Sequence, residues 1–216
     1  MGEKMFRGND VRRDIVIVTR NLYRRGLVSA LTGNVSARCL NNPACFWITP
    51  SGIFKGGLRP EYLVKLDLDG NILEGFFRPS IEWRFHAAIY RVRQDVNAVI
   101  HAHNPLVNAL ALAGIKLDVS MLSEVEVFVK GVEYIEYIPP GSVELAKAVG
   151  DKASTGVNAI ILEKHGIIAL GRDIYEAETI AEALEDLALA HLILKMFGRE
   201  SSYSKDIAKN LARVSV

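Results

Sequence analysis

Hydrophobic and polar residues along the first third of the chain predict one helix followed by two hairpins. Apolar residues recur every three or four positions over 10–25 and a glycine follows, which predicts an amphipathic helix that ends at a glycine. Apolar runs over 34–40 and 45–49 flank a turn-prone Asn-Asn-Pro sequence and predict a β-hairpin. A second hairpin is predicted over 63–68 and 72–73, because an Asp-Gly-Asn turn separates these two runs.

From residue 81 onward, helical and strand patterns alternate along the chain. The clearest element is the last one. Asp173 and Glu176 form the aspartate variant of a capping box there, and about two dozen residues rich in Ala, Leu and Glu follow them. The remaining patterns predict helices over 81–93, 106–113 and 142–153, and strands over 97–101, 125–129, 134–138, 158–162 and 166–170.

These elements predict an α/β fold in which helices cover one sheet. The consecutive hairpins favour a mainly antiparallel sheet over a doubly wound parallel one. The 216 residues contain no repeat, no low-complexity linker and no break in composition, so we expect a single domain spanning residues 1–216. The predicted architecture is therefore a three-layer α/β/α sandwich around a mainly antiparallel central sheet.

Charge and composition argue against several classes of partner. The 26 basic and 25 acidic residues nearly cancel, so the chain lacks the broad positive field of proteins that bind nucleic acid or anionic membranes nonspecifically. Charged residues are scattered through the N-terminal segment, which has no uninterrupted apolar run of the kind found in a signal peptide or membrane span. We therefore expect a cytoplasmic protein that binds neither nucleic acid nor membrane.

The only two cysteines, Cys39 and Cys45, are six residues apart. They are too sparse for a secreted disulfide framework and lack the CxxC spacing of redox or zinc motifs. We interpret them as structural thiols. Pairing stays open as the alternative, on the condition that a hairpin brings their Cα atoms within disulfide range.

Three of the five histidines have the arrangement of a metal site. His101 and His103 stand two apart at a predicted strand end, so both side chains can reach one metal ion at about 2.0–2.1 Å from each nitrogen. His165 lies between two predicted strands, where it can face this pair, although a plain turn residue is the alternative. Three histidines with an open fourth position are typical of catalytic zinc. We interpret His86 and His191, on predicted helices without a second donor at metal spacing, as surface or packing residues.

Three short loops combine glycine or serine with hydroxyl or amide side chains. They are Thr-Gly-Asn-Val-Ser at 32–36, Thr-Pro-Ser-Gly at 49–52 and Pro-Ser-Ile-Glu at 79–82. Backbone N–H groups of such loops approach anions closely, so together they can hold a phosphate, although each alone is more often an ordinary turn. Glu82 in the third loop has two interpretations: it stabilises the helix N-terminus through the helix dipole, or it is a general base beside the metal.

The order of five motifs resembles that of one enzyme family. Along the chain, TGNVSAR, ITPSGI, PSIEWRFH, AVIHAHNP and EKHGII resemble the motifs of class II aldolases, a family that includes fuculose-phosphate aldolases and ribulose-phosphate 4-epimerases. The resemblance spans roughly 11–194 and leaves 199–216 poorly matched. Five motifs in one order are far more specific than any one of them. The resemblance implies the three-layer sandwich and a homotetramer with active sites between subunits.

The resemblance also implies a site and a reaction. Zinc, for which Co²⁺ or Mn²⁺ can substitute, polarises the carbonyl of a phosphorylated sugar and stabilises an enediolate. A short ketose 1-phosphate similar to L-fuculose 1-phosphate is then cleaved reversibly to dihydroxyacetone phosphate and an aldehyde. The implied zinc ligands are His101, His103 and His165, the acid/base is Glu82, and the phosphate site consists of Gly33, Asn34, Ser51, Gly52 and Ser80.

Departures from the family pattern leave alternatives open. Ile81 stands where fuculose-phosphate aldolases carry a second serine, and Leu122 falls near the position of their proton-donating tyrosine. Tyr203, in the poorly matched end, is a candidate contributor to the aldehyde pocket. Glu124 lies in a region where related methylthioribulose 1-phosphate dehydratases place a catalytic glutamate, so a dehydratase or a 4-epimerase is the alternative reaction. A noncatalytic interaction domain like the head of adducin is disfavoured, because the histidines, the glutamate and the loops are intact.

Overall fold

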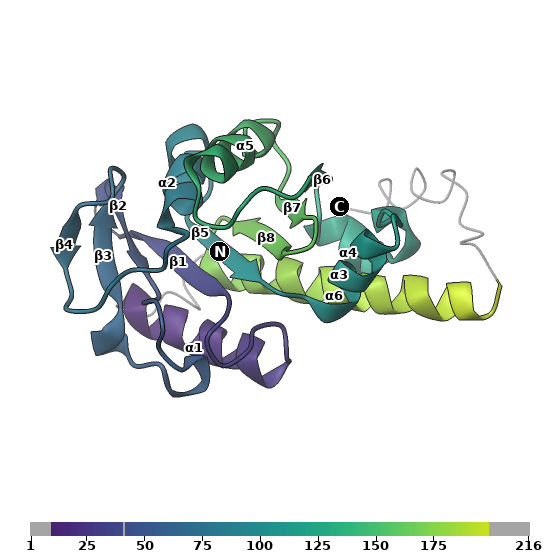
Figure 1. Cartoon of the computed structure of the whole chain (residues 1–216), viewed down its shortest axis with the longest axis horizontal. Helices are drawn as coiled ribbons and strands as arrows, with labels where there is room; N and C mark the ends of the chain where they lie inside the picture. The colour runs from purple at the N-terminus through teal and green to yellow at the C-terminus, as the bar shows by residue number, and fades with distance from the viewer. Residues whose placement is uncertain (1–9, 41, 199–216) are drawn as a thin grey trace, which may run out of the picture.

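One eight-stranded sheet runs through the computed structural model, which describes residues 10–40 and 42–198 (Figure 1). All neighbouring strands are antiparallel except the pair at one edge, which confirms the predicted mainly antiparallel sheet. The strands are β1 (Asn34–Cys39), β2 (Asn42–Ile48), β3 (Val64–Asp67), β4 (Ile72–Glu74), β5 (Ala98–Ala102), β6 (Val132–Ile135), β7 (Ala159–Leu162) and β8 (Gly166–Gly171).

Helices cover both faces of this sheet, as the three-layer prediction requires. One face carries α1 (Val11–Arg24) and α6 (Ile174–Met196), and the other carries α2 (Trp83–Val92) and α5 (Val143–Ala153) (Figure 1). No helix in the described ranges is both long enough and apolar enough to cross a membrane. The described helical elements also include α3 (Pro105–Leu112), α4 (Ser123–Phe128) and the 3₁₀ turns η1 (Lys55–Gly57), η2 (Pro60–Tyr62) and η3 (Val119–Met121).

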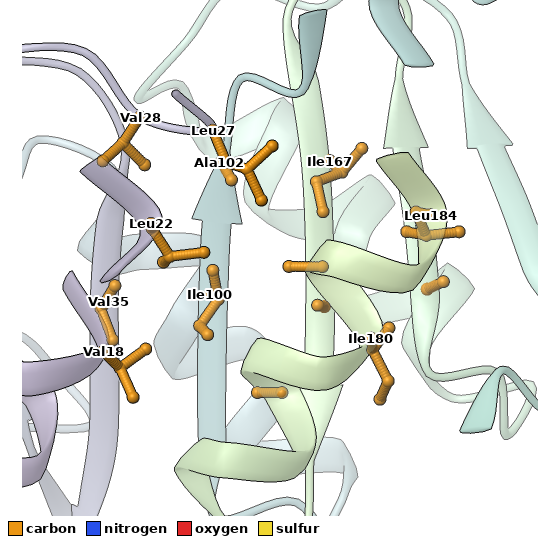
Figure 2. Packing of buried hydrophobic residues seen from close by; sticks show 14 of the residues in the cluster. Val18, Leu22, Leu27, Val28, Val35, Ile100, Ala102, Ile167, Ile180 and Leu184 are labelled. Carbon is orange, nitrogen blue, oxygen red and sulfur yellow. The ribbon is translucent and has the colours of Figure 1, made fainter. Parts of the chain in front are cut away.

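Alternation along the strands divides the apolar side chains between two cores. Within β5, Ile100 belongs to the core under α1 and α6, and Val99 belongs to the core under α2 and α5. Figure 2 shows the first core, to which α1 contributes Leu22, α6 contributes Leu184 and β8 contributes Ile167. The strand order β4-β3-β2-β1-β5-β8-β7-β6 places β1, β5 and β8 between these cores. Side chains at the ends of these strands therefore sit on a rigid scaffold.

The segment after α3 differs from its predicted structure. We predicted a strand over 125–129, but the structure has the short helix α4 there. Alternating Glu and Val has the two-residue period of a strand, yet the two buried positions, Val125 and Val129, are four residues apart, which is helical spacing. The strand predicted over 134–138 is β6, which begins two residues earlier and pairs in parallel with β7.

A disulfide joins Cys39 and Cys45 across the β1–β2 hairpin. Their Cα atoms are 5.7 Å apart, within the range of natural disulfides. The interpretation as structural thiols is therefore wrong for this structure. The predicted hairpin meets the geometric condition on which pairing depended.

Candidate metal centre

The candidate site lies where four adjacent strands of the sheet begin or end. Because antiparallel neighbours run in opposite directions, the starts of β1 and β8 lie beside the ends of β2 and β5. Asn34, the first residue of β1, is paired with His101 near the end of β5. His103 follows β5, and His165 immediately precedes β8. Motifs that are far apart in the sequence thus meet at one end of these central strands.

The three predicted histidine ligands come together at this end of the central strands. One nitrogen from each of His101, His103 and His165 lies within 4.8 Å of the other two, and the Nε2 atoms of His101 and His103 are 3.0 Å apart. His101 Nδ1 lies 2.9 Å from the carbonyl oxygen of Ile167, which can only accept a hydrogen bond. The proton of His101 is therefore on Nδ1, and Nε2 presents a lone pair to the centre.

The histidines are neutral in this environment. Burial lowers the pKa of His101 to about 3 and that of His165 to about 4, with neighbouring histidines adding to the effect. Neutral imidazole is the form that binds metal ions. Three neutral imidazoles whose donor atoms converge fit a divalent cation, and zinc accepts this set of ligands.

Glu82 lies against the histidines rather than capping its helix. It occupies the N-cap position of α2, but its side chain makes no capping hydrogen bond. Its Oε2 lies 3.3 Å from His101 Nε2, and its Oε1 lies 3.4 Å from His165 Nε2. Oε1 is buried and has no hydrogen-bond partner among the described residues. A buried carboxylate oxygen without a donor is costly, so this position favours a cation in front of Glu82.

A chain of buried hydrogen bonds holds Glu82 in this position. Asn34 Nδ2 donates to Glu82 Oε2 at 2.7 Å, so Asn34 Oδ1 is the free acceptor of that amide. His86 Nε2 lies against this oxygen and must carry the proton. His86 Nδ1 then accepts from Ser36 Oγ at 2.7 Å, and Ser36 Oγ accepts from Tyr90 Oη at 2.8 Å. Each donor in the chain meets one acceptor, which fixes the direction of the Asn34 amide.

His86 is therefore more than the surface or packing residue that the sequence suggested. It is fully buried, and burial, with a smaller contribution from His101, holds its pKa well below the ordinary value for histidine. It stands four residues after Glu82, one helical turn along, and this spacing was a signal that the sequence offered. His191 lies on α6, where its Nε2 accepts from the Asp118 backbone N–H at 2.9 Å. This contact matches its interpretation as a surface or packing residue.

Replacing His86 by leucine tests this positioning role. The change leaves Ser36 and Asn34 without their partner and frees the amide that orients Glu82. We expect turnover to fall by about 10- to 100-fold, as for other residues that orient a site from behind, with bound metal retained. Tyr90→Phe removes only the far end of the chain and should have a smaller effect. Wild-type kcat in His86→Leu at full metal content would contradict the role.

Gly166 leaves room for the histidines. A Cβ atom at this position would collide with the Ala102 carbonyl oxygen and lie 3.1 Å from ring atoms of both His101 and His103. We expect Gly166→Ala to destabilise the protein by about 1–3 kcal/mol and to weaken metal binding, because β5 and β8 must separate. The control is Gly150→Ala in α5, where a Cβ makes only an ordinary contact with Ala88 and should stabilise the helix. Thermal unfolding and metal titration of both variants check this.

A cavity of about 230 Å³ opens beside the histidines. Its walls combine the predicted phosphate loops with Glu82, so most of the predicted site residues meet in one place. Gly52 does not line this cavity; it follows Ser51 with a φ of +70°, a conformation that suits glycine. The cavity is lined by Leu31, Thr32, Gly33, Asn34, Pro50, Ser51, Lys55, Ser80, Ile81, Glu82, His103, Pro140 and His165.

Two predicted candidates are not brought to this cavity. Glu124 is exposed on α4 and does not line the cavity. Tyr203 lies outside the described residues. Conversely, Lys55 lines the cavity although the sequence analysis passed over it, because a lysine in a glycine-rich turn has the pattern of an exposed loop residue.

Comparisons with known proteins agree with the geometry. The family model described as Class II Aldolase and Adducin N-terminal domain matches residues 13–192. An L-fuculose phosphate aldolase from Methanococcus maripaludis (strain C5) is 37% identical over 82% of this chain and 93% of its own length. A 5-deoxy-D-ribulose 1-phosphate aldolase from Bacillus thuringiensis is 32% identical over 94% of this chain and 93% of its own. A solved L-fuculose 1-phosphate aldolase superposes with a TM-score of 0.83 and 31% identity, covering 95% of both chains.

Proposed function

Because this chain belongs to the class II aldolase and adducin N-terminal domain family, we propose that it cleaves a short ketose 1-phosphate, similar to L-fuculose 1-phosphate, with zinc as its metal. The chain is a lyase of the class II aldolase type, and enzymes of this class depend on a metal ion. The products of the proposed reaction are dihydroxyacetone phosphate and an aldehyde.

One observation carries this proposal: the carboxylate of Glu82 lies 3.3 Å from His101 Nε2 and 3.4 Å from His165 Nε2, at the wall of a cavity. We assign His101, His103 and His165 as the ligands that hold the metal. When bound there, a divalent metal polarises a substrate carbonyl as a Lewis acid.

Glu82 is then the proton carrier at the carbon next to that carbonyl. In the cleavage direction the bond between C3 and C4 of the ketose breaks, and the C4 hydroxyl passes its proton to the group that returns it to the aldehyde oxygen in synthesis. The aldehyde leaves, and Glu82 gives a proton to C3 of the dihydroxyacetone phosphate half. In the synthetic direction Glu82 takes the same proton. The hydrogen bond from Asn34 to Glu82 Oε2 leaves Oε1 as the oxygen that exchanges it.

The phosphate group is proposed to bind to the three loops at the cavity wall. Gly33, Asn34, Ser51 and Ser80 line the cavity, and Gly52 adjoins it. Their hydroxyl, amide and backbone groups are donors, which suits a phosphate. The Ser51 backbone N–H, however, donates to the Arg78 carbonyl at 2.9 Å, so the serine hydroxyl is the contact that we assign to the ligand.

A panel of phosphorylated ketoses tests the reaction. Zinc-loaded protein should give cleavage that a chelator abolishes, and mass spectrometry of the products should reveal two fragments. Loss of water would support the dehydratase alternative, and an isomer of unchanged mass would support the 4-epimerase. If no ketose phosphate is converted and no zinc, cobalt or manganese is retained after metal-supplemented purification, the noncatalytic adducin-like alternative is favoured.

We also propose a cytoplasmic homotetramer with active sites between subunits, as the family resemblance implies. In the described part of the chain no tyrosine lines the cavity. A neighbouring subunit is therefore the natural source of the group that donates a proton to the aldehyde oxygen in the synthetic direction. Light scattering coupled to size-exclusion chromatography should give four times the 23.8 kDa mass of the chain. A monomer with full turnover would exclude sites shared between subunits.

A further inference from the structure

Lys55 is a buried lysine whose charge has no counter-ion in the described structure. Only 2% of its surface is exposed. Its Nζ donates to the carbonyl oxygen of Pro50 at 3.2 Å, and none of the ion pairs among the described residues includes it. Lysines are seldom fully buried unless they are paired, because removing an ammonium group from water is costly. A single neutral carbonyl compensates only part of that cost.

The backbone around Lys55 holds the side chain in place. The Lys55 backbone N–H donates to the Ala30 carbonyl at 2.9 Å, which ties η1 to the loop that precedes β1. On the other side, the neighbouring Phe54 packs edge-on against Tyr23 of α1, with ring centroids 5.2 Å apart. The backbone of Lys55 and the ring of its neighbour Phe54 are thus both anchored, so the burial of Lys55 belongs to a well-packed segment.

Lys55 lines the same cavity as the metal-site residues and the donor loops. Glu82, His103 and His165 form one part of the wall of this cavity, and Ser51 and Ser80 contribute hydroxyl groups. Ile81, also in the wall, adds no polar side chain. Lys55 is the only lysine or arginine among the residues that line the cavity in the described structure. Apart from the carboxylate of Glu82 on the metal side, an anion inside the cavity would meet uncharged groups and this one ammonium group.

We propose that Lys55 is a binding residue for the phosphate group of the substrate, and that its ammonium group pairs with the phosphate inside this cavity. This inference rests on the proposed function for the identity of the anion. Burial alone lowers the pKa of Lys55 to about 8, so the side chain is mostly charged at pH 7. A bound phosphate supplies the missing counter-charge, and a hydrogen bond between two oppositely charged groups is stronger than the one to the neutral Pro50 carbonyl.

Lys55→Met tests this role, because methionine keeps most of the side-chain volume and removes the charge. Calorimetry with metal-loaded protein and inorganic phosphate at pH 7 should show affinity about 10- to 100-fold weaker than wild type. The melting temperature should stay the same or rise, since an uncompensated buried charge is removed. Lys147→Met, at an exposed lysine of α5, controls for the loss of one positive charge and should bind phosphate normally. Lys55→Gln, a polar neutral replacement, should repeat the loss.

The outcomes separate this inference from the proposed reaction. Unchanged phosphate affinity in both Lys55 variants, with a lower melting temperature, would overturn it and make Lys55 a structural support of the Pro50 carbonyl. Absence of phosphate binding in the wild type would overturn it as well, whatever the enzyme cleaves. Phosphate binding that depends on Lys55, without any metal-dependent cleavage, would refute only the proposed reaction. With an active substrate, Lys55→Met should raise KM far more than it lowers kcat.

Discussion

Replacing Glu82 by glutamine is expected to lower turnover by about 10²- to 10⁴-fold, the usual contribution of a general base. Glutamine has nearly the same shape, and its amide oxygen can still accept from Asn34 Nδ2, which donates to Glu82 Oε2 at 2.7 Å. The three histidines keep their positions, so bound metal should stay at the wild-type level. What is lost is the ability to take and return a proton.

Exchange of a carbon-bound proton measures this step without knowledge of the aldehyde. In D₂O, the wild-type enzyme should replace one C3 proton of dihydroxyacetone phosphate by deuterium, and NMR should show this exchange almost abolished in Glu82→Gln. Glu124→Gln is the matched control, because Glu124 is exposed on α4 and does not line the cavity. Normal exchange in Glu82→Gln at full metal content would remove Glu82 from the proton transfer. Loss of activity in Glu124→Gln would instead revive the dehydratase alternative.

Local patterns in the sequence predicted most of the fold. Amphipathic spacing gave α1, and an aspartate N-cap marked the start of α6, where Asp173 accepts from the backbone N–H groups of Tyr175 and Glu176 as expected. Periodicity did not predict α4. Its alternating Glu and Val residues fit a strand, and its one buried position per helical turn fits a helix equally well. The parallel pairing of β6 with β7 depends on the crossover through α5, which is a tertiary property that no local pattern contains.

The candidate site was predictable to the extent that its residues stand at strand ends. His101, His103 and His165 belong to motifs beside predicted strands, and antiparallel pairing brings such ends together. His86 was misjudged because a helical histidine among apolar residues looks like packing, and only the Asn34–Glu82 contact gives its ring a polar role. The burial of Lys55 follows from long-range packing, so the sequence offered no sign of it.

Replacing His103 by alanine is expected to remove the metal and, with it, all measurable cleavage. His103 is only partly buried at the end of β5, so its loss should leave the fold intact, whereas fully buried His101 also hydrogen-bonds Ile167. Because loss of a mere outer partner weakens metal binding by about 10- to 100-fold, loss of one of three ligands should weaken it by more.

Thermal unfolding separates metal loss from misfolding in this variant. A ligand present at about 1,000 times its Kd stabilises a folded protein by about 4 kcal/mol, so a chelator should lower the wild-type melting temperature by several degrees. The metal-free melting temperatures of wild type and His103→Ala should agree, and the chelator should have no effect on the variant. His191→Ala is the matched control, since His191 lies on α6, away from the metal site, and its Nε2 accepts from the Asp118 backbone N–H. Wild-type metal content in His103→Ala would show that His103 is not a metal ligand. The open coordination position of the metal would then have to be sought on another side of Glu82.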